Sequence, residues 1–400
     1  MPSDYGGAEH RKSLDLTRTF HGVGFVHERT MAGCATLSLL SPQTRGASIH
    51  RERGRMMTPL QRVQAVWAGQ TPDRVPVCLH KFLMAAREAG IPLEKYRRDP
   101  PAIACAHLTA VEKYGYDCIV LDTDTTMLAE AMGATSECAP NQPGRIVAPA
   151  IRSLREVERL KIINPETDGR IPALLEAIRL IELQVGNEIA IRGNADQGAF
   201  DLACMVCGTE NFLAELASAP ENPALAQLLE ICYQSHFEVH RAIFKAGADF
   251  TSMGDSLAGP DVISPQMFNR FARPYQDRLV RDLATEGIHT VIHICGDTTQ
   301  ILDALSCYDF CGFELDYKTD AVRAKNTVGV RHILFGNIDP SGVLAHGTPS
   351  LVREKTRQLI SVWKPGGYFI LNAGCAIPPT TPPENIFALI QTAQEEGGYV

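Results

Sequence analysis

The sequence predicts a (β/α)8 barrel, and three observations lead to that prediction. Short apolar runs of strand length alternate with longer helical segments, eight such runs can be counted, and polar residues follow the ends of these runs. The chain has 400 residues, of which 45% are hydrophobic and 21% charged, a composition that suits a folded globular protein. Because α/β barrels use this much chain as one unit, we expect a single domain.

The first part of the chain differs from the rest. Residues 1–55 mix Ser, Thr, Gly, Arg and His without sustained periodicity, so we interpret them as a poorly ordered leader. They also fit an upstream extension of a gene whose natural start is Met56 or Met57. A Thr cap at position 58, a proline at the first helical position and an apolar stripe then predict a helix. The barrel domain is therefore expected over residues 56–400.

The predicted strands follow from short runs that are rich in β-branched and apolar residues. In chain order they are RVPVCL (74–79), YDCIVLD (116–122), IAIRGNA (189–195), DFTSMGD (249–255), HTVIHIC (289–295), GFELDY (312–317), HILFGNI (332–338) and YFILNAGC (368–375). Between them lie helical segments that end near a glycine or a similar breaker, such as 100–115, 264–287 and 348–363.

Charge and composition exclude several classes of function. The net charge is −8 and no block of basic and aromatic residues occurs, so we do not expect a nucleic-acid partner. No window approaches the roughly 18 to 20 consecutive apolar residues of a membrane helix, so we expect no membrane partner. The 12 cysteines are scattered through apolar segments, which indicates reduced thiols and a cytoplasmic location. Around Cys34 the apolar run follows the cysteine, whereas an export signal needs it before the cleavage point.

Polar residues gather where the predicted strands end. In a (β/α)8 barrel all strands end at one rim, which is where the chemistry of such folds takes place. Each aspartate alone is as well explained as a loop cap, so their common location is the informative feature. The rim residues are Asp122, Asp124, Asn194, Asp196, Gln197, Asp255, His293, Cys295, Asp297, Glu314, Asp316, Asn337, Asp339, Asn372 and Cys375.

A pair of metal-ligand residues ends the fifth predicted strand. Successive side chains of a strand point to opposite faces, so His293 and Cys295 share one face and project together. A catalytic zinc site has three protein ligands and one open position, and Cys375, after the eighth strand, is the candidate third ligand. The competing pair is Cys204 and Cys207, but one C-x-x-C without a second does not support a zinc ribbon, so we favour packing.

Longer motifs make the pattern more specific. From Met56 onward the chain resembles the uroporphyrinogen decarboxylase superfamily, and within it the methylcobamide:thiol methyltransferases of the coenzyme M type. The resemblance rests on LDTDTTMLAEAMG, SPQMFNRFARPYQ, HICGD, FGNIDP and GCAIPPTTPPENI, which cover nearly the whole chain after the leader. It implies a (β/α)8 fold with His293, Cys295 and Cys375 as the zinc ligands.

The sequence departs from the decarboxylases of that superfamily. Their arginine-bearing motif would fall where His80 and Lys81 stand, and they have a histidine at the position of Cys375 and need no metal. Asp124, by its spacing to Gly133, does match their catalytic aspartate. Porphyrin decarboxylation is therefore the poorer interpretation.

We expect a zinc-dependent enzyme that moves a methyl group between a methylcobamide and a small substrate, most simply a thiol. Two thiolates cancel the zinc charge and His293 adds none, so a bound substrate thiol loses its proton yet stays nucleophilic. The chain lacks the DxHxxG pattern of a corrinoid-carrying domain, so a separate corrinoid protein is the expected partner. Further expected partners are a small methyl donor or acceptor and, as one option, a second copy in a homodimer.

Other rim residues receive expected roles around the zinc. Asp124, Asp255 and Glu314 are the candidate catalytic residues, and Glu314 is also the candidate occasional fourth ligand. The candidate cofactor contacts are Asn194, Asp297 and Asn337.

Two alternatives to thiol methylation stay open at this point. With the same zinc site, the enzyme could remove a methyl group from a methoxylated compound and pass it to a cob(I)amide. The barrel could also be a non-catalytic zinc-binding or corrinoid-docking protein. Structural zinc sites usually have four protein ligands, and only three good ones are visible here.

Overall fold

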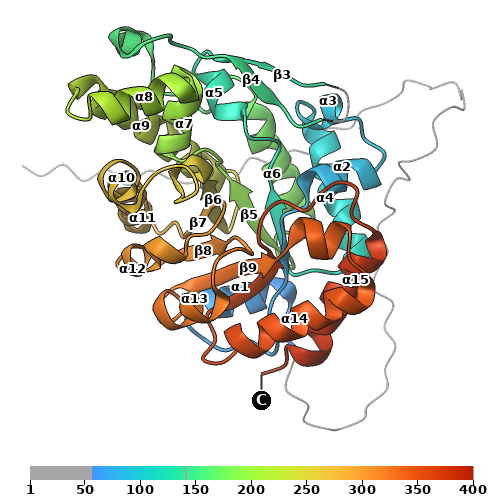
Figure 1. The fold of residues 1–400 in the computed structure, drawn as a ribbon. Coiled ribbons are helices and arrows are strands. Elements are labelled where there is room, and N and C mark those ends of the chain that lie inside the picture. The colour runs from blue at the N-terminus through green and yellow to red at the C-terminus, as the bar shows by residue number, and fades with distance from the viewer. Residues whose placement is uncertain (1–55, 140–141, 400) are drawn as a thin grey trace, which may run out of the picture. The chain divides into compact units, whose positions relative to one another are not determined.

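The barrel prediction is confirmed by the computed structural model, which describes residues 56–139 and 142–399. Eight parallel strands form one sheet in the order β1-β2-β5-β6-β7-β8-β9-β10, with helices around it (Figure 1). The sheet closes between its first and last strands, where Val77 bridges Leu371 in parallel and the Leu371 amide donates to the Pro76 carbonyl oxygen at 2.9 Å. The predicted leader, residues 1–55, lies outside the described residues.

All eight predicted strands are present, each within the run from which it was predicted. Their bounds are β1 Cys78–Leu79, β2 Cys118–Leu121, β5 Ala190–Asn194, β6 Phe250–Gly254, β7 Thr290–Ile294, β8 Gly312–Leu315, β9 Ile333–Ile338 and β10 Phe369–Ala373. The paired part is shorter than its run, and after β2 and β6 the polar end residues Asp122 and Asp255 already belong to the rim loops.

The longer helices cover the outside of the barrel, and most of them begin with a proline at the first or second helical position. They are α1 Pro59–Trp67, α2 Phe82–Glu88, α4 Pro100–Tyr114, α6 Ile171–Val185, α7 Ala199–Cys207, α8 Thr209–Ser218, α9 Pro223–Lys245, α11 Arg273–Thr285, α13 Ala321–Thr327, α14 Pro349–Trp363 and α15 Pro383–Glu396. The short ones are α3 Leu93–Tyr96, α5 Met127–Ala131, α10 Pro265–Met267 and α12 Leu302–Leu305.

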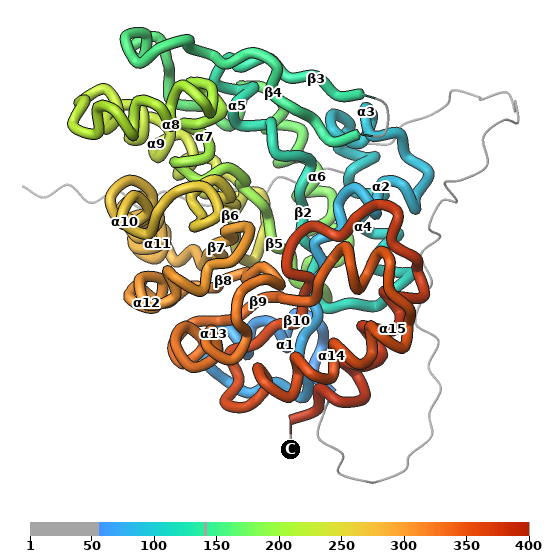
Figure 2. Tube along the Cα trace, in the orientation of Figure 1, coloured from blue at the N-terminus to red at the C-terminus, as the bar shows by residue number. Residues whose placement is uncertain are grey.

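The barrel interior is apolar at one end and polar at the other. Val291, Phe250 and Phe335 pack inside the barrel at the end where the strands begin, and Trp67 of α1 closes this end. Figure 2 shows α1 beside β10, consistent with their contacts. On β7, Val291 belongs to this inner cluster and Ile292 to the outer core, so the predicted alternation that points His293 inward is confirmed.

A two-stranded antiparallel hairpin was not predicted from the sequence. It consists of β3 Thr135–Glu137 and β4 Arg145–Ala148, and β3 lies against α5 at the top of Figure 1. Both strands are mostly exposed, so they lack the buried apolar run by which the barrel strands were found. Within the described ranges, no helix combines the length and the apolar character that crossing a membrane requires.

Candidate metal centre

The structure brings together the three predicted metal ligands. His293 is the fourth residue of β7, Cys295 follows that strand, and Cys375 follows β10. Their ligand atoms all lie within 4.8 Å of one another. The His293 Nε2 to Cys295 Sγ distance is 3.1 Å, and the two sulfur atoms are 3.9 Å apart.

The donor set and its spacing fit a zinc ion. Zinc binds Cys sulfur at about 2.3 Å, so two thiolates on one tetrahedral ion are about 3.8 Å apart. The observed sulfur separation of 3.9 Å needs almost no adjustment, whereas His293 must move a few tenths of an ångström away from Cys295. Among the described residues, no fourth His, Cys, Asp or Glu joins this group. Three protein ligands leave one position for a substrate, as in catalytic zinc sites.

Acid–base properties of the three side chains also suit a metal. The pKa of Cys295 falls to about 3, first because Cys375 donates a hydrogen bond to its sulfur and then because His293 and Ser256 lie beside it. Burial alone lowers the pKa of His293, but the Cys295 thiolate outweighs burial and raises it to about 10. The cluster thus stabilises a thiolate without an external base, and thiolate is the form that binds zinc.

Two neighbours hold the ligands in place. The Nδ1 atom of His293 lies 2.9 Å from the backbone oxygen of Glu314, so it donates there and Nε2 faces the sulfurs. The hydroxyl of Ser256 donates to Cys295 Sγ at 3.1 Å. Ser256 was not predicted from the sequence, and the signal that could have found it is its place next to Asp255 at the end of β6.

Asp255, predicted as catalytic, lies beside the ligands, and its amide donates to the His293 carbonyl oxygen at 2.8 Å. Its carboxylate accepts from the Asp201 amide at 2.8 Å and from the Gln276 side chain at 2.7 Å, and only 1% of the residue is exposed. Asp201 in return accepts from the amides of Ser256 and Leu257. The two carboxylates therefore tie the loops after β5 and β6 together and fix the position of Ser256.

Below the ligands, polar side chains form a floor inside the barrel. His80 Nε2 lies 3.0 Å from Asp122 Oδ2, which also accepts from Asn194 at 2.8 Å. Glu314 forms a buried ion pair with Arg192, and its other carboxylate oxygen lies 3.5 Å from His80 Nδ1. Its carboxylate is thus engaged in the floor instead of joining the sulfur ligands. Asn194, a predicted cofactor contact, is thus bonded to Asp122.

Charge pairing in this polar floor shifts several pKa values. Burial lowers the pKa of His80, but Asp122 and Glu314 raise it to about 9, so this imidazole is charged at neutral pH. Burial and the neighbouring Asp122 raise the pKa of Asp196 to about 7. Burial also opposes ionisation of Glu314, yet Arg192 and His80 hold its pKa well below the usual value.

Asp124, the third predicted catalytic residue, is held by two arginines. Arg97 pairs with one carboxylate oxygen, and Arg170 lies 2.9 Å from the other. Thr126 donates its amide and its hydroxyl to the same carboxylate, at 2.9 and 2.8 Å. Only 1% of the residue is exposed, so its carboxylate is enclosed by these partners.

The remaining predicted rim residues fix loops. Asp297 accepts from the Thr299 amide at 2.9 Å, and Asp339 accepts from the amides of Ser341 and Gly342. Asn337, a predicted cofactor contact, donates to the Asp316 carbonyl oxygen at 3.3 Å. The competing pair, Cys204 and Cys207, is buried in the core on α7, in agreement with the packing role expected for it.

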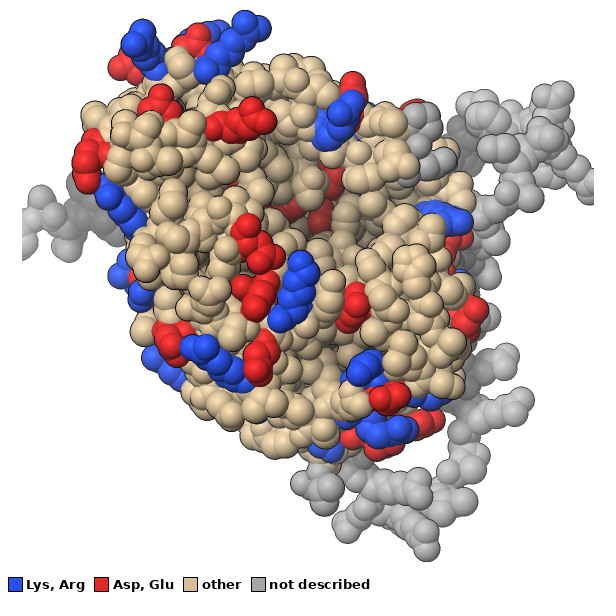
Figure 3. Space-filling model, viewed as in Figure 1, with Lys and Arg blue, Asp and Glu red and all other residues tan. Residues whose placement is uncertain are grey.

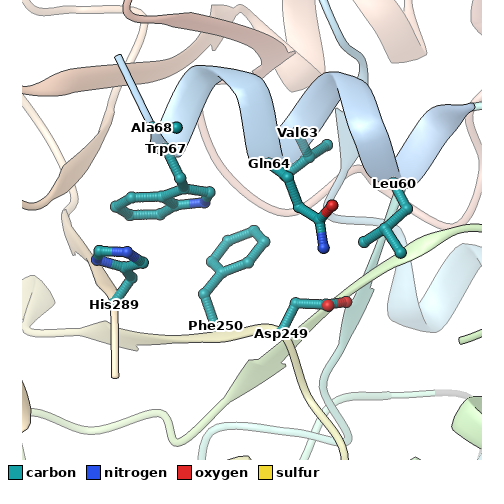
Figure 4. Close-up of a pocket in the computed structure, with 8 residues that line it drawn as sticks. All are labelled: Leu60, Val63, Gln64, Trp67, Ala68, Asp249, Phe250 and His289. Carbon is teal, nitrogen blue, oxygen red and sulfur yellow. The ribbon is translucent and has the colours of Figure 1, made fainter. Parts of the chain in front are cut away.

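A separate pocket of about 240 Å³ lies at the other end of the barrel (Figure 4). Trp67 and Gln64 of α1 line it together with Phe250 and His289, which stand at the beginnings of β6 and β7. The rings of Trp67 and His289 are stacked, with their centroids 4.6 Å apart. Because His293 and Cys295 lie at the opposite ends of the strands, this pocket is not part of the metal centre.

Comparison with protein families gives one match that spans nearly the whole described chain. The model of the family described as "Uroporphyrinogen decarboxylase (URO-D)" matches residues 58–396. The match includes every strand of the barrel and all three ligands of the candidate metal centre.

Individual relatives include methyltransferases and decarboxylases. Methylcobamide:CoM methyltransferase MtaA of Methanosarcina barkeri is 29% identical over 342 residues, which cover 84% of this chain and 97% of the relative. Methylcobamide:CoM methyltransferase MtbA of Methanosarcina acetivorans is 26% identical, covering 84% and 98%. A uroporphyrinogen decarboxylase of Syntrophotalea carbinolica is 29% identical, covering 80% and 94%. Among solved structures, a methyltransferase from Methanosarcina mazei matches with a TM-score of 0.77 and 27% identity, covering 84% and 98%.

Proposed function

The chain belongs to the uroporphyrinogen decarboxylase family, and from this premise we propose that it is a zinc-dependent methyltransferase. It moves the methyl group of a methylcobamide, carried by a separate corrinoid protein, to a small thiol. The observation that carries the proposal is the convergence of His293, Cys295 and Cys375 at the rim of the barrel. Relatives named methylcobamide:CoM methyltransferases support it, since coenzyme M is a thiol.

The protein's own residues prepare the site for a thiol. Nδ1 of His293 is occupied by the Glu314 carbonyl oxygen, so Nε2 is directed to the ligand position, and the Ser256 hydroxyl stabilises negative charge on Cys295. Zinc bound by these three residues would make a substrate thiol lose its proton at neutral pH while keeping it nucleophilic. Cys375 and Cys295 supply the two negative charges that balance the ion.

The role of the polar floor is to orient the rest of the substrate. His80, Asp122 and Asn194 form one hydrogen-bonded chain, and Glu314 joins it through His80. The hydrogen bonds among His80, Asp122 and Asn194 and the ion pair between Glu314 and Arg192 hold these groups in position before substrate arrives. Such a fixed floor holds the substrate with its sulfur toward the metal centre.

The test is methyl transfer from free methylcobalamin to a panel of thiols, followed by the change in its visible spectrum. We expect transfer that needs zinc and is abolished by Cys295→Ala, because that substitution removes the thiolate between the other two ligands. The matched control is Cys204→Ala, a cysteine buried in the core, which should keep both metal and activity.

Three results would contradict this function. Activity only with cob(I)alamin and methoxylated aromatics would reverse the direction of transfer and make the protein a demethylase. Decarboxylation of uroporphyrinogen without methyl transfer would place the chain with the decarboxylases of its family. Full activity of Cys295→Ala would separate the reaction from the candidate metal centre.

A further inference from the structure

We propose that the small substrate carries a cationic group, such as an ammonium, which lies against the carboxylates of Asp122 and Asp196. This inference rests on the proposed function, because it concerns the far end of the thiol whose sulfur the metal centre binds. It names a charge class of substrate that differs from an anionic thiol.

The two carboxylates follow the neighbouring strands β2 and β5, at the end of the barrel that carries the metal centre. Asp196 packs on Gly254, since a Cβ atom there would come within 2.7 Å of Asp196 Oδ1. Gly254 of β6 is paired in register with His293 of β7, so Asp196 lies one strand away from the strand that leads to His293 and Cys295.

Asp122 follows β2, which pairs with β5, so it lies beside the strand end that leads to Asp196. It contacts His80 Nε2, and the backbone oxygen of His80 accepts from the Ile377 amide at 2.8 Å, two residues beyond Cys375. A small molecule with its sulfur at the metal centre would therefore meet both carboxylates with one group at its far end.

The ion pairs of this region leave one of the two carboxylates without a cation. Arg192 is paired with Glu314, and His80 is shared between Asp122 and Glu314. In the described ranges Asp196 has no ion-pair partner, although only 8% of the residue is exposed. Two further arginines, Arg97 and Arg170, are already paired with Asp124 and Glu130.

A buried acceptor next to Asp196 indicates the same kind of ligand. The side-chain oxygen of Gln197 is buried without a hydrogen-bond partner among the described residues, and the residue is only 3% exposed. Gln197 has a φ of 63°, a conformation that residues other than glycine rarely adopt, so the turn holds it in an unusual position. An ammonium supplies a donor for this oxygen and a positive charge for the unpaired carboxylate of Asp196, whereas a sulfonate supplies neither.

The surface agrees with this assignment. In Figure 3, acidic side chains gather in and around a hollow near the middle of the face that is drawn, with few basic ones inside it. A cation is drawn to such a hollow and an anion is repelled, since low-dielectric walls strengthen both effects.

The experiment compares three thiols with the same two-carbon chain and different ends: 2-aminoethanethiol, 2-mercaptoethanol and 2-mercaptoethanesulfonate. Their S-methyl products are also titrated by calorimetry into the zinc-loaded and the metal-free protein. These products have no S–H group, so differences in thiol acidity do not affect their binding. We expect the amine to bind and react at least about tenfold better than the sulfonate, with the alcohol between them. Equal or tighter binding of the sulfonate product would overturn the inference.

A variant tests whether Asp196 is responsible for the preference for the amine over the sulfonate. Asp196→Asn keeps the shape of the side chain and should bring the ratio of amine to sulfonate binding close to one. Asp303→Asn, an exposed residue paired with Arg323 on α12 and α13, is the matched control and should keep the wild-type ratio. An unchanged ratio in Asp196→Asn would remove that residue from the proposal. If no thiol is methylated, the proposed function fails, while the calorimetry still decides the charge preference.

Discussion

At the scale of single residues, the sulfur of Cys295 is the atom on which most contacts of the metal centre converge. It lies 3.1 Å from His293 Nε2, 3.1 Å from the Ser256 hydroxyl and 3.9 Å from the sulfur of Cys375. Of these neighbours only Ser256 is not a ligand candidate, so its contribution can be measured without removing a ligand.

We predict that Ser256→Ala weakens zinc binding about tenfold, because hydrogen bonds from outside the ligand set orient and stabilise the ligands. Competition with a chromophoric chelator measures the dissociation constant. Ser218→Ala is the control, since Ser218 is exposed and donates only to its own helix. Equal zinc affinity of wild type and Ser256→Ala would mean that the hydroxyl contact does not support the thiolate.

The meeting of the three candidate ligands at one place was predictable from the sequence for a definite reason. Strand alternation places His293 and Cys295 on one face, and the barrel rule brings the end of the eighth strand to the same rim. The partners of Glu314 were not predictable, because Arg192 and His80 come from β5 and from the end of β1 and meet it only inside the closed barrel. A carboxylate expected near the metal was therefore found engaged with cations.

At the scale of elements, the loop after β2 is fixed by charges from two helical segments. Arg97 follows α3 and Arg170 precedes α6, and both meet Asp124 two residues after the predicted strand ends. Although burial opposes ionisation of Asp124, Arg170 and Arg97 lower its pKa to about 2. The carboxylate therefore links three parts of the chain that are far apart in sequence.

We predict that Asp124→Asn lowers the free energy of unfolding by about 3 kcal/mol at pH 7, since it leaves two buried arginines with less compensating charge. The folded-state pKa lies below the ordinary value of Asp, so this stabilisation is present above about pH 4 and is lost as the pH falls toward 2. Urea unfolding of wild type and variant between pH 7 and pH 3 measures both effects. Equal stability of the two proteins at pH 7 would show that pairing of Asp124 with the two arginines does not stabilise the fold.

Sequence patterns predicted the buried strands well and the exposed or irregular elements poorly. All eight barrel strands were found because each is buried and apolar, whereas the β3–β4 hairpin was missed because its residues are mostly exposed. In the predicted helix 264–287, the structure has a short helix, a π-helical turn over Phe268–Ala272 and then α11. Helical periodicity does not reveal such a turn, since one extra residue changes only the local hydrogen bonds.

At the scale of the whole barrel, packing and chemistry are separated along its axis. Phe250, Phe335 and Trp67 fill the end where the strands begin, and the charged floor and the sulfur ligands occupy the other end. This division lets the apolar end stabilise the barrel while the polar end holds buried charges in fixed positions. The central claim is that these positions create a zinc site with an open place for substrate.

X-ray absorption at the zinc edge, together with the metal content per chain, tests this claim most directly. We predict about one zinc per chain, with two sulfur ligands at about 2.3 Å and one protein nitrogen at about 2.0 Å, and loss of most of the metal in Cys375→Ala without unfolding. Cys204→Ala should give the wild-type spectrum. A zinc with four sulfur ligands, or a Cys375→Ala variant that keeps its full zinc content, would contradict the account.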